Sequence, residues 1–375
     1  MAVQIRQVRI FPELEKLKTV WNSVASNTPF SSWQWLVTWA ENYIREDQLY
    51  ILVAETSGGG IVGILPLFRD RSVVEGRVLR MLGSGNVCTD YLSLFSLPEY
   101  RHEVCQQFAL YLTAMVNDHA AGWDALLLEH IAQADTNVCE FTDSMRLHGS
   151  ELMKTQGQNC WRIAIPDSWE KYLAEMSKSH RKQVKRIERE LIETGKARLH
   201  TVESETQLKQ AMELLVDLHQ KRRNRLGQIG CFACERFSNF LFMASQRLLE
   251  AGMLRLHWVE VAGRPVAAEF QLSDGQTTYA YQAGIDPESL ELEPGRLIMI
   301  ATIRQALEAG NRGFDFLRGD EPYKAHFRAK PQPTTTWRMI APSQRAQVHR
   351  TLLSASNRVK RWLKRGRELV MNVDR

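Results

Sequence analysis

The spacing of apolar and polar residues in the first half of this chain predicts both helices and strands. An apolar residue at every third or fourth position indicates a helix, and strict alternation between turn residues indicates a strand. The expected helices are 12–26, one capped by Ser31 or Ser32 that runs through Trp39, and 102–116. The expected strands are 49–54, 61–68, 78–82, 91–94 and 123–128.

The second half repeats this plan. Its strand pair, 254–261 and 265–272, lies over the first pair at an offset of 204 residues, which indicates an internal duplication. The other expected elements are a helix from Ser168, a basic helix over 177–193, a helix over 205–226, a strand over 279–284, a helix opened by Pro294 and a strand from Phe314. We therefore predict an α/β protein (α+β, with mixed sheets) of two duplicated units, 1–166 and 167–342, and a basic tail, 343–375.

Composition fits this organisation. A chain of 375 residues with 44% hydrophobic content is long enough for two domains of about 150 to 200 residues. No apolar run approaches the roughly 18 residues that span a bilayer, and the start of the chain has no basic region followed by an apolar one, so we expect a cytoplasmic protein. Cys231 and Cys234 have a metal-like spacing, but no second pair completes four ligands, and we expect no metal.

Positive charge gathers in two places. From Arg338 to the end, ten Lys and Arg residues face two Asp and Glu residues, although the whole chain carries only +5. This tail predicts a basic helix with Trp362 on its apolar side, which can lie on an anionic membrane surface or remain solvated. In the helix over 177–193, one face carries Lys178, Arg181, Lys182, Lys185, Arg186 and Arg189. That face is either a solvated surface or a binding site for an anionic partner such as a phosphorylated sugar, a lipid headgroup or RNA.

Charged residues follow the last apolar strand of the second half. Asp315, Arg318, Asp320, Tyr323 and Lys324 stand at and beyond the end of this strand, where an open sheet places its ligand crevice. A carboxylate there can position or deprotonate an amine, a tyrosine can return a proton, and a lysine can compensate negative charge. The same residues could instead form an ion-pair network that ties a loop to the core.

These segments resemble the GNAT acyltransferases, and in particular their CelD-like, cellulose-biosynthesis-associated branch, which is related to the Fem-type aminoacyl transferases. The resemblance rests on 263–270, 281–287, the Pro294-Gly295 pair and, most specifically, 315–324. It implies two such units in tandem and a coenzyme A thioester as the acyl donor. The chain departs from the family in one respect, because a single glycine opens the helix at Pro294 where many members carry several.

The resemblance also implies roles for individual residues. The donor's pantetheine would pair with the strand that contains Tyr281 and Gln282, and its pyrophosphate would lie on the start of the next helix, at Pro294, Gly295 and Arg296. The residues expected at the acceptor are Asp90, Tyr91, Asp315 and Arg318, and those expected in catalysis are Asp320, Tyr323, Lys324 and Glu269. His326, the one histidine near this corner, is a weaker candidate for the base.

The function expected from these residues is transfer of an acyl group from acetyl- or another acyl-coenzyme A. The acceptor would be an amine of a sugar or of another cell-envelope or exopolysaccharide precursor. One alternative is a Fem-type transferase that uses aminoacyl-tRNA, with Lys182 and Arg186 on the RNA. A second alternative is a non-catalytic partner of a polysaccharide synthase, held at the inner membrane by the tail.

Overall fold

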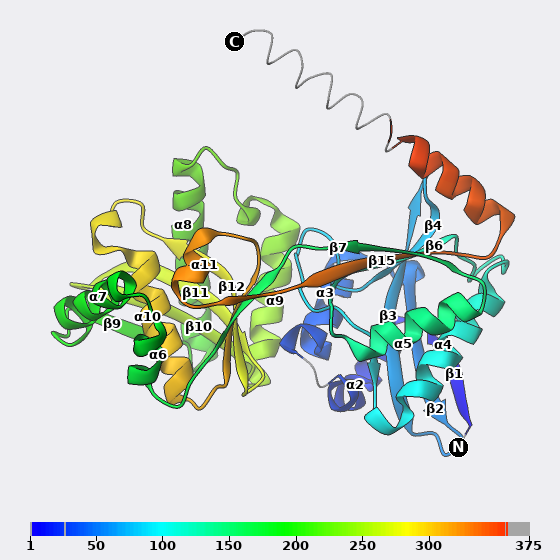
Figure 1. Cartoon of the computed structure of the whole chain (residues 1–375), viewed down its shortest axis with the longest axis horizontal. Helices are drawn as coiled ribbons and strands as arrows, with labels where there is room; N and C mark the ends of the chain where they lie inside the picture. Colours follow the sequence, from blue (N-terminus) through cyan, green and yellow to red (C-terminus); the bar gives the residue numbers. More distant parts are fainter. Residues whose placement is uncertain (1, 26–27, 357, 359–375) are drawn as a thin grey trace, which may run out of the picture.

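The computed structural model describes residues 2–25, 28–356 and 358, and it contains two mixed sheets with helices packed on them (Figure 1). The two units lie side by side, with the N-terminal unit in blue and cyan and most of the C-terminal unit in green, yellow and orange. The expected class, a mixed α/β protein with two similar units, is confirmed.

The first sheet has eight strands. In spatial order they are β1 (Val3–Val8), β2 (Leu49–Thr56), β3 (Ile61–Ser72), β4 (Gly76–Met81), β6 (Ala125–Ala132), β15 (Thr334–Ile340) and β7 (Glu151–Gln156), and β5 (Phe95–Ser96) pairs with β3. Strands β4 and β6 are parallel, and the other pairs in this sheet are antiparallel. The predicted hairpin of β2 and β3 is therefore confirmed.

Five α-helices belong to the first unit. They are α1 (Phe11–Lys16), α2 (Lys18–Val24), α3 (Trp33–Tyr43), α4 (Arg101–Met115) and α5 (Thr136–Leu147). The helix expected over 12–26 is broken at Leu17. Ser32 caps α3 by accepting a hydrogen bond from the Trp35 backbone N–H, as predicted, and the apolar face of α3 is buried.

The second sheet has seven strands. In spatial order they are β14 (Lys330–Gln332), β8 (Cys160–Ala164), β13 (Gly313–Arg318), β12 (Thr277–Ile285), β11 (Arg264–Ser273), β10 (Leu254–Val261) and β9 (Ala197–Thr201). Its helices are α6 (Trp169–Glu175), α7 (Lys178–Ile187), α8 (Glu205–Arg225), α9 (Glu235–Glu250), α10 (Pro294–Glu308) and α11 (Pro322–His326). The basic helix α7 buries Val184 and Ile187 and leaves most of its cationic face in solvent, as its pattern predicted.

The two sheets exchange strands. β8 lies before residue 166 but pairs in the second sheet, and β15 lies before residue 342 but inserts between β6 and β7 of the first sheet (Figure 1). The chain therefore passes between the units repeatedly. The boundary between residues 166 and 167 stays a prediction of where one unit ends in sequence.

The strand expected over 91–94 is wrong. Residues 89–94 contain no strand, and Tyr91 has a φ of +58°, which is incompatible with an extended backbone. The residues that follow β4 instead leave the first sheet and run against the second unit. Apolar residues there mark burial at the interface between the units, and alternation alone cannot distinguish such a segment from a strand.

A shared hydrophobic core joins the units. One cluster of buried residues runs from the first sheet through α3 to α8 and α9, and a second fills the space beneath α6, α7 and α10. At the interface the ring centroids of Trp35 and Phe240 are 5.0 Å apart, and Arg247 on α9 pairs with Glu41 on α3 at 2.7 Å. The interface therefore has the composition of a domain core.

Residues 344–356 of the tail are helical. Val359, Trp362 and most of the cations of the expected membrane-binding face lie outside the described residues. Within the ranges that the structure describes, no helix is both long and apolar enough to cross a bilayer.

Candidate active site

The parallel strands of the second sheet separate after three residue pairs. β12 and β13 pair over Thr277–Tyr279 and Gly313–Asp315, whereas β12 continues to Ile285. The register between β11 and β12 shifts by one residue at Tyr281, which is a β-bulge. Beyond Tyr279, the edge of β12 that faces β13 therefore makes no ladder hydrogen bonds among the described strands. We call the opening between this edge and β13 the seam.

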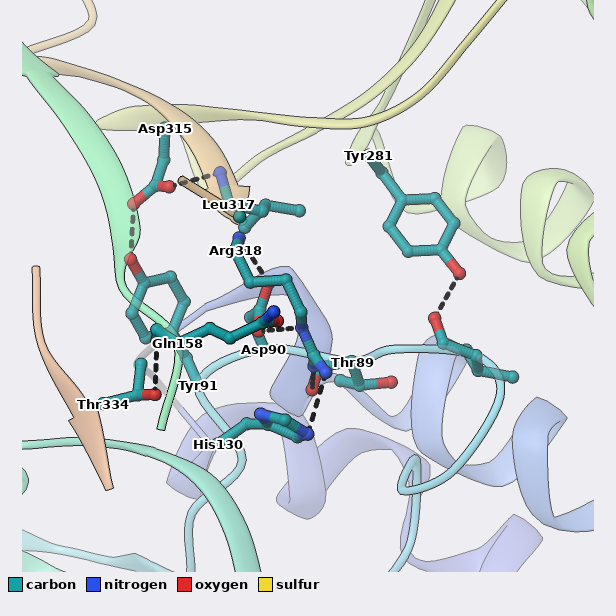
Figure 2. A network of polar contacts seen from close by, with 12 residues as sticks. Thr89, Asp90, Tyr91, His130, Gln158, Tyr281, Asp315, Leu317, Arg318 and Thr334 are labelled. Carbon is teal, nitrogen blue, oxygen red and sulfur yellow. Dashed lines mark hydrogen bonds and ion pairs between the residues drawn. The ribbon is translucent and has the colours of Figure 1, made fainter. Parts of the chain in front are cut away.

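Asp315 stands at the start of the seam. Tyr91 Oη donates a hydrogen bond to its Oδ2 at 2.6 Å, and the Leu317 backbone N–H donates to its Oδ1 at 2.7 Å (Figure 2). The left-handed conformation of Leu317, with φ of +58°, turns that N–H back toward the carboxylate. Burial raises the pKa of Asp315 to about 6, and the hydrogen bonds oppose this shift.

Arg318 joins the two units just beyond Asp315. Its Nε donates to Asp90 Oδ1 at 2.7 Å, its Nη2 to the Thr89 carbonyl at 2.6 Å, and its Nη1 contacts His130 Nε2 at 2.8 Å (Figure 2). Burial, with Arg318 nearby, lowers the pKa of His130 to about 4, so this ring is neutral and accepts the bond. Burial also raises the pKa of Asp90, and Arg318 opposes that shift.

A cleft of about 750 Å³ lies between the units and reaches Asp315. Residues of the first unit that line it include Thr28, Tyr91, Ser93, Ser96, Arg101, Asp135 and Asn137. The second sheet contributes Arg162, Tyr279, Asp315 and Gln332. A molecule bound in this cleft would therefore contact both units and the start of the seam.

Lys324 holds the end of β13. Its buried ammonium donates to the carbonyls of Leu317, Arg318 and Gly319 at 3.1, 2.8 and 3.0 Å, and it lies 2.9 Å from Glu321. These contacts stabilise the turn that follows Asp315. The structure thus places Lys324 next to the site through the backbone, and a direct role in catalysis stays a prediction.

Glu269 and Tyr323 belong to the other face of the sheet. Ala268 and Phe270 belong to the core cluster that faces the first unit, so strand alternation directs Glu269 toward α10. Glu269 is 1% exposed, its Oε2 has no hydrogen-bond partner among the described residues, and burial raises the pKa of its carboxyl to about 8. Tyr323 is 45% exposed, and partial burial and the nearby Glu269 raise its pKa.

Asp320 and His326 lie at the rim of this region. Asp320 Oδ1 accepts hydrogen bonds from Trp161 Nε1 at 2.9 Å and from Asn159 Nδ2 at 3.2 Å. The ring of His326 lies 4.3 Å from that of His180, at the start of the basic helix α7. Both residues are exposed, and neither contacts Asp315 through a hydrogen bond among the described atoms.

The start of α10 has a basic environment. Pro294 and Gly295 form its first positions, and the nearest atom to a methyl group built on Gly295 would be 3.9 Å away, so this surface is open. Glu293 pairs with Arg296 and with Arg186 of α7. The structure therefore brings part of the basic face of α7 to the expected donor site.

The other two expected donor residues lie at the bulge of β12. Tyr281 Oη donates to the Val87 carbonyl at 2.6 Å (Figure 2). The Tyr281 ring packs against Trp35, with the ring centroids 5.0 Å apart. Gln282 contacts Cys231 Sγ at 3.8 Å. Tyr281 thus fixes the seam against the first unit, and binding of a donor by either side chain stays a prediction.

The structure therefore brings together the four residues expected at the acceptor, Asp90, Tyr91, Asp315 and Arg318. Three further residues, Arg101, Arg162 and His130, were missed by sequence reasoning. His130 lies near the end of an apolar strand segment, 125–132, much as Asp315 lies in the segment 314–317, and that signal could have identified it. The two arginines carry no such signal, because only the pairing of strands and units brings them to the cleft.

The seam and Asp315 lie in the second of the two similar units. Residues 178–325 match the family model described as an acetyltransferase (GNAT) domain. This domain contains β10 to β13, α10 and most of α11, and thus the seam and Asp315. The expected GNAT-type domain is confirmed, and the CelD-like branch stays a prediction.

Solved structures share this fold over 90 to 93% of the chain. FemX is similar with a TM-score of 0.63 at 11% identity, over 92% of this chain and 99% of FemX. L-PGS from Bacillus licheniformis has a TM-score of 0.53 at 11% identity, over 93% of this chain and 98% of that protein. A conserved protein of unknown function from Bacteroides thetaiotaomicron has a TM-score of 0.56 at 11% identity, over 90% of this chain and 100% of that protein. No curated protein matches the sequence.

Proposed function

We propose that the protein transfers an acyl group from acyl-coenzyme A to an amine of a sugar or of another cell-envelope or exopolysaccharide precursor. One observation carries this proposal: the seam between β12 and β13 opens at Asp315, on the wall of the cleft between the units. A donor in the seam and an acceptor in the cleft would meet at this carboxylate.

The donor side of the proposal rests on the free edge of β12 and on the start of α10. Within Ala280–Ile285, the backbone N–H and C=O groups that point toward β13 rather than toward β11 are available to the amides of a pantetheine arm. Gly295 leaves room for a phosphate near the helix N-terminus, and Arg186 and Arg296 add positive charge there. A phosphate would compete with the Glu293 carboxylate for these two arginines.

Asp315 is the proposed base. An amine attacks a carbonyl only when it is neutral, and the thioester of the bound donor supplies that carbonyl. With a pKa of about 6, Asp315 is mostly ionised at neutral pH and is a stronger base than an ordinary carboxylate. Tyr91 and the Leu317 N–H orient both of its oxygens, so the side chain is positioned before the acceptor binds.

Other residues have supporting roles in this proposal. Arg318, with Asp90 and Thr89, joins the cleft wall of the first unit to the end of β13, and Lys324 holds the turn that follows. From the opposite face of the sheet, Tyr323 is the proposed proton donor to the leaving thiolate, with Glu269 close to it. Asp320 lies at the entrance.

A second candidate donor is an aminoacyl-tRNA. It is favoured by the position of α7, whose exposed cations Lys178, Lys182 and Lys185 continue from Arg186 at the start of α10. A stripe of this kind suits a polyphosphate backbone longer than that of coenzyme A. Transfer of an amino acid from such an ester would use the same seam and the same Asp315.

Ligand binding distinguishes these donors. Under the acyl-coenzyme A proposal, acetyl-coenzyme A raises the melting temperature, and the increase is reduced in Arg296→Gln but unchanged in Lys182→Gln. Under the second, charged tRNA binds with a steep salt dependence and requires Lys182 and Arg186, whereas acetyl-coenzyme A has no effect. If neither ligand binds, the proposed activity is wrong and a non-catalytic role is favoured.

A further inference from the structure

We infer that the acceptor carries an anionic group, a phosphate or a carboxylate, which binds to Arg101 and Arg162 in the cleft between the units. This inference rests on the proposed function, because it assigns the chemical class of the molecule whose amine meets Asp315. It is carried by the position of Arg162, by the unused hydrogen-bonding capacity of both guanidinium groups, and by the polarity of the walls.

Arg162 on β8 is directly opposite Asp315 on the adjacent strand β13. In the second sheet Tyr279, Asp315 and Arg162 are in register on β12, β13 and β8, so their side chains form one row on the cleft face. The Arg162 side chain leans over Gly313, where a methyl group would lie 2.6 Å from its Nε, and its Nη2 donates to Thr277 Oγ1 at 2.7 Å. Gly313 is thus needed for this conformation.

The two guanidinium groups have donors to spare. Among the described residues each guanidinium makes one hydrogen bond: Arg101 Nε donates to Asn137 Oδ1 at 3.0 Å, and Arg162 Nη2 donates to Thr277 Oγ1. An arginine carries five N–H donors, so most of them remain available for a planar anion. Among the described residues, neither arginine lies within 4.0 Å of a carboxylate oxygen, although the structure contains ion pairs at many other arginines.

The two carboxylates in the cleft are already engaged. Asp315 accepts from Tyr91 and from the Leu317 N–H, and Asp135 caps α5 by accepting from the Val138 N–H. Burial raises the pKa of both carboxyl groups, and their hydrogen bonds oppose this shift. An incoming anion therefore meets two incompletely bonded cations and two carboxylates that already hold other hydrogen bonds.

The walls of the cleft contain no large aliphatic side chain among the described residues. None of the residues that line the cleft is leucine, isoleucine, valine, methionine or phenylalanine. The lining includes the hydroxyl and amide side chains of Thr28, Ser93, Ser96, Thr136, Asn137, Gln133 and Gln332, and its apolar members are the small residues Pro98, Ala132, Ala134 and Pro333 beside the rings of Tyr91 and Tyr279. Such walls match the hydroxyl groups of a sugar and do not favour an acyl chain of a lipid.

The distance between the Arg162 guanidinium and Asp315 indicates how far apart the anionic group and the amine of the acceptor lie. The Arg162 guanidinium lies over Gly313, two residues along β13 from Asp315, and this corresponds to about 7 Å along a strand. An amine at Asp315 and an anionic group at Arg162 would therefore lie on the same sugar ring or on adjacent rings. Arg101, from the first unit, would bind the same group from the other wall or a second one.

Calorimetric titration in the absence of any donor tests the inference. The probes are glucosamine, which has no anionic group, glucosamine 6-phosphate and muramic acid, which carries a carboxylate. We expect at least one anionic probe to bind tenfold or more tightly than glucosamine, and the comparison between the two identifies phosphate or carboxylate. Arg162→Gln and Arg101→Gln should each reduce this preference about tenfold, and Arg146→Gln, an exposed arginine on the same unit, should leave it unchanged.

Three results would overturn the inference: equal binding of all three probes, no binding of either anionic probe, or a preference that survives in the double variant Arg101→Gln/Arg162→Gln. Melting temperatures of the variants establish that they are folded. If the probes bind with the expected preference but no acyl group is transferred, the proposed activity is wrong and the anion-binding site is retained. Transfer to glucosamine that neither arginine variant affects would leave that activity standing and remove the anionic acceptor.

Discussion

The two units share a topology but differ at their central parallel strands. In each sheet the parallel pair consists of three residue pairs, β4 with β6 and β12 with β13. β4 ends at Met81, one residue after its last pair, whereas β12 continues for six residues beyond Tyr279. In the first unit it is β6 that continues, as far as Ala132, and the Tyr91 N–H donates to its His130 carbonyl at 3.1 Å, so the chain that follows β4 covers part of that edge.

The residues at the last parallel pair differ as well. In the second unit this pair is Tyr279 with Asp315, and in the first it is Arg80 with Leu127. Leu127 is 6% exposed and cannot titrate. The chain that leaves β4 also crosses to the other unit, where Asp90 meets Arg318 and Tyr91 meets Asp315. The second unit therefore carries the seam, whereas the first unit supplies much of the opposite wall of the cleft.

The largest effect expected from this difference is at Asp315. Asp315→Asn preserves the shape of the side chain and an acceptor for the Leu317 N–H but removes the base, so the rate of acyl transfer should fall by about 10²- to 10⁴-fold. Asp143→Asn, at an exposed site on α5, should have no effect. A variant that retains more than a tenth of the wild-type kcat would show that another group is the base.

The pH dependence of transfer tests the same residue independently. Because Asp315 must be ionised and has a pKa of about 6, log kcat/KM should rise by one per pH unit below about pH 6 and level off above it. The acidic limb should be absent from the residual activity of Asp315→Asn. An unchanged limb in that variant would assign it to a different group.

The next largest effect concerns the contact between the units. Arg318→Met leaves the buried Asp90 carboxylate without its partner and should lower the free energy of unfolding by about 3 to 5 kcal/mol. Arg247→Met breaks the other arginine pair between the units, but that pair is about a quarter exposed, and we expect a loss of about 1 kcal/mol or less. Urea denaturation measures both. Equal losses would mean that Arg318 only packs at the interface.

Sequence reasoning identified the elements with strong periodicity and the residues at the end of β13. The basic helix α7, the two hairpins and the cap at Ser32 follow from local spacing, which reports which face of an element is buried. Local spacing does not report the partner of a strand. The insertion of β15 into the first sheet and of β8 into the second depends on contacts between distant segments, and Arg162 reaches the cleft only through that exchange.

The residues after β13 illustrate the same limit. Chemistry at a strand end predicted that Asp315 and Lys324 would share a site, and the structure connects them through Leu317, whose N–H donates to Asp315 and whose carbonyl accepts from Lys324. The sequence could not show that three backbone carbonyls surround the Lys324 ammonium, because this depends on the left-handed turn at Leu317. Nor could it separate Glu269 from Asp315, since the face of a strand is known only relative to its neighbours.

A smaller effect is expected at Glu269, which occupies the position of Leu65 in the duplicated hairpin. Burial raises its pKa to about 8, so between about pH 4.5 and 8 the folded protein holds a proton that the unfolded chain has lost. Stability should therefore fall as pH rises through this window, by up to about 1.4 kcal/mol per unit. Glu269→Gln should remove this dependence, with a gain in melting temperature that is largest near pH 8 and small near pH 5. If the gain were the same at both values, burial of the charge would not be its cause.

The smallest effect sharpens the contrast between the two helices that follow the central strands. Gly295 is the second residue of α10, whereas the second residue of α4 is His102. A methyl group on Gly295 would meet nothing closer than 3.9 Å, so Gly295→Ala should stabilise the helix, by at most about 1 kcal/mol. The same methyl group would lie where a donor phosphate approaches the backbone, so KM for acetyl-coenzyme A should rise roughly tenfold with kcat little changed, since the contact is made equally before and during transfer.

The test is whether Gly295→Ala raises stability while it weakens donor binding. Thermal melting and steady-state kinetics on the same preparation measure the two effects. Gly310→Ala, beyond the end of α10 at a φ of +79°, is the control: it should lower stability and leave KM unchanged. A Gly295→Ala protein with unchanged KM would place the donor's phosphates elsewhere, and the start of α10 would then differ from that of α4 only as a helix terminus.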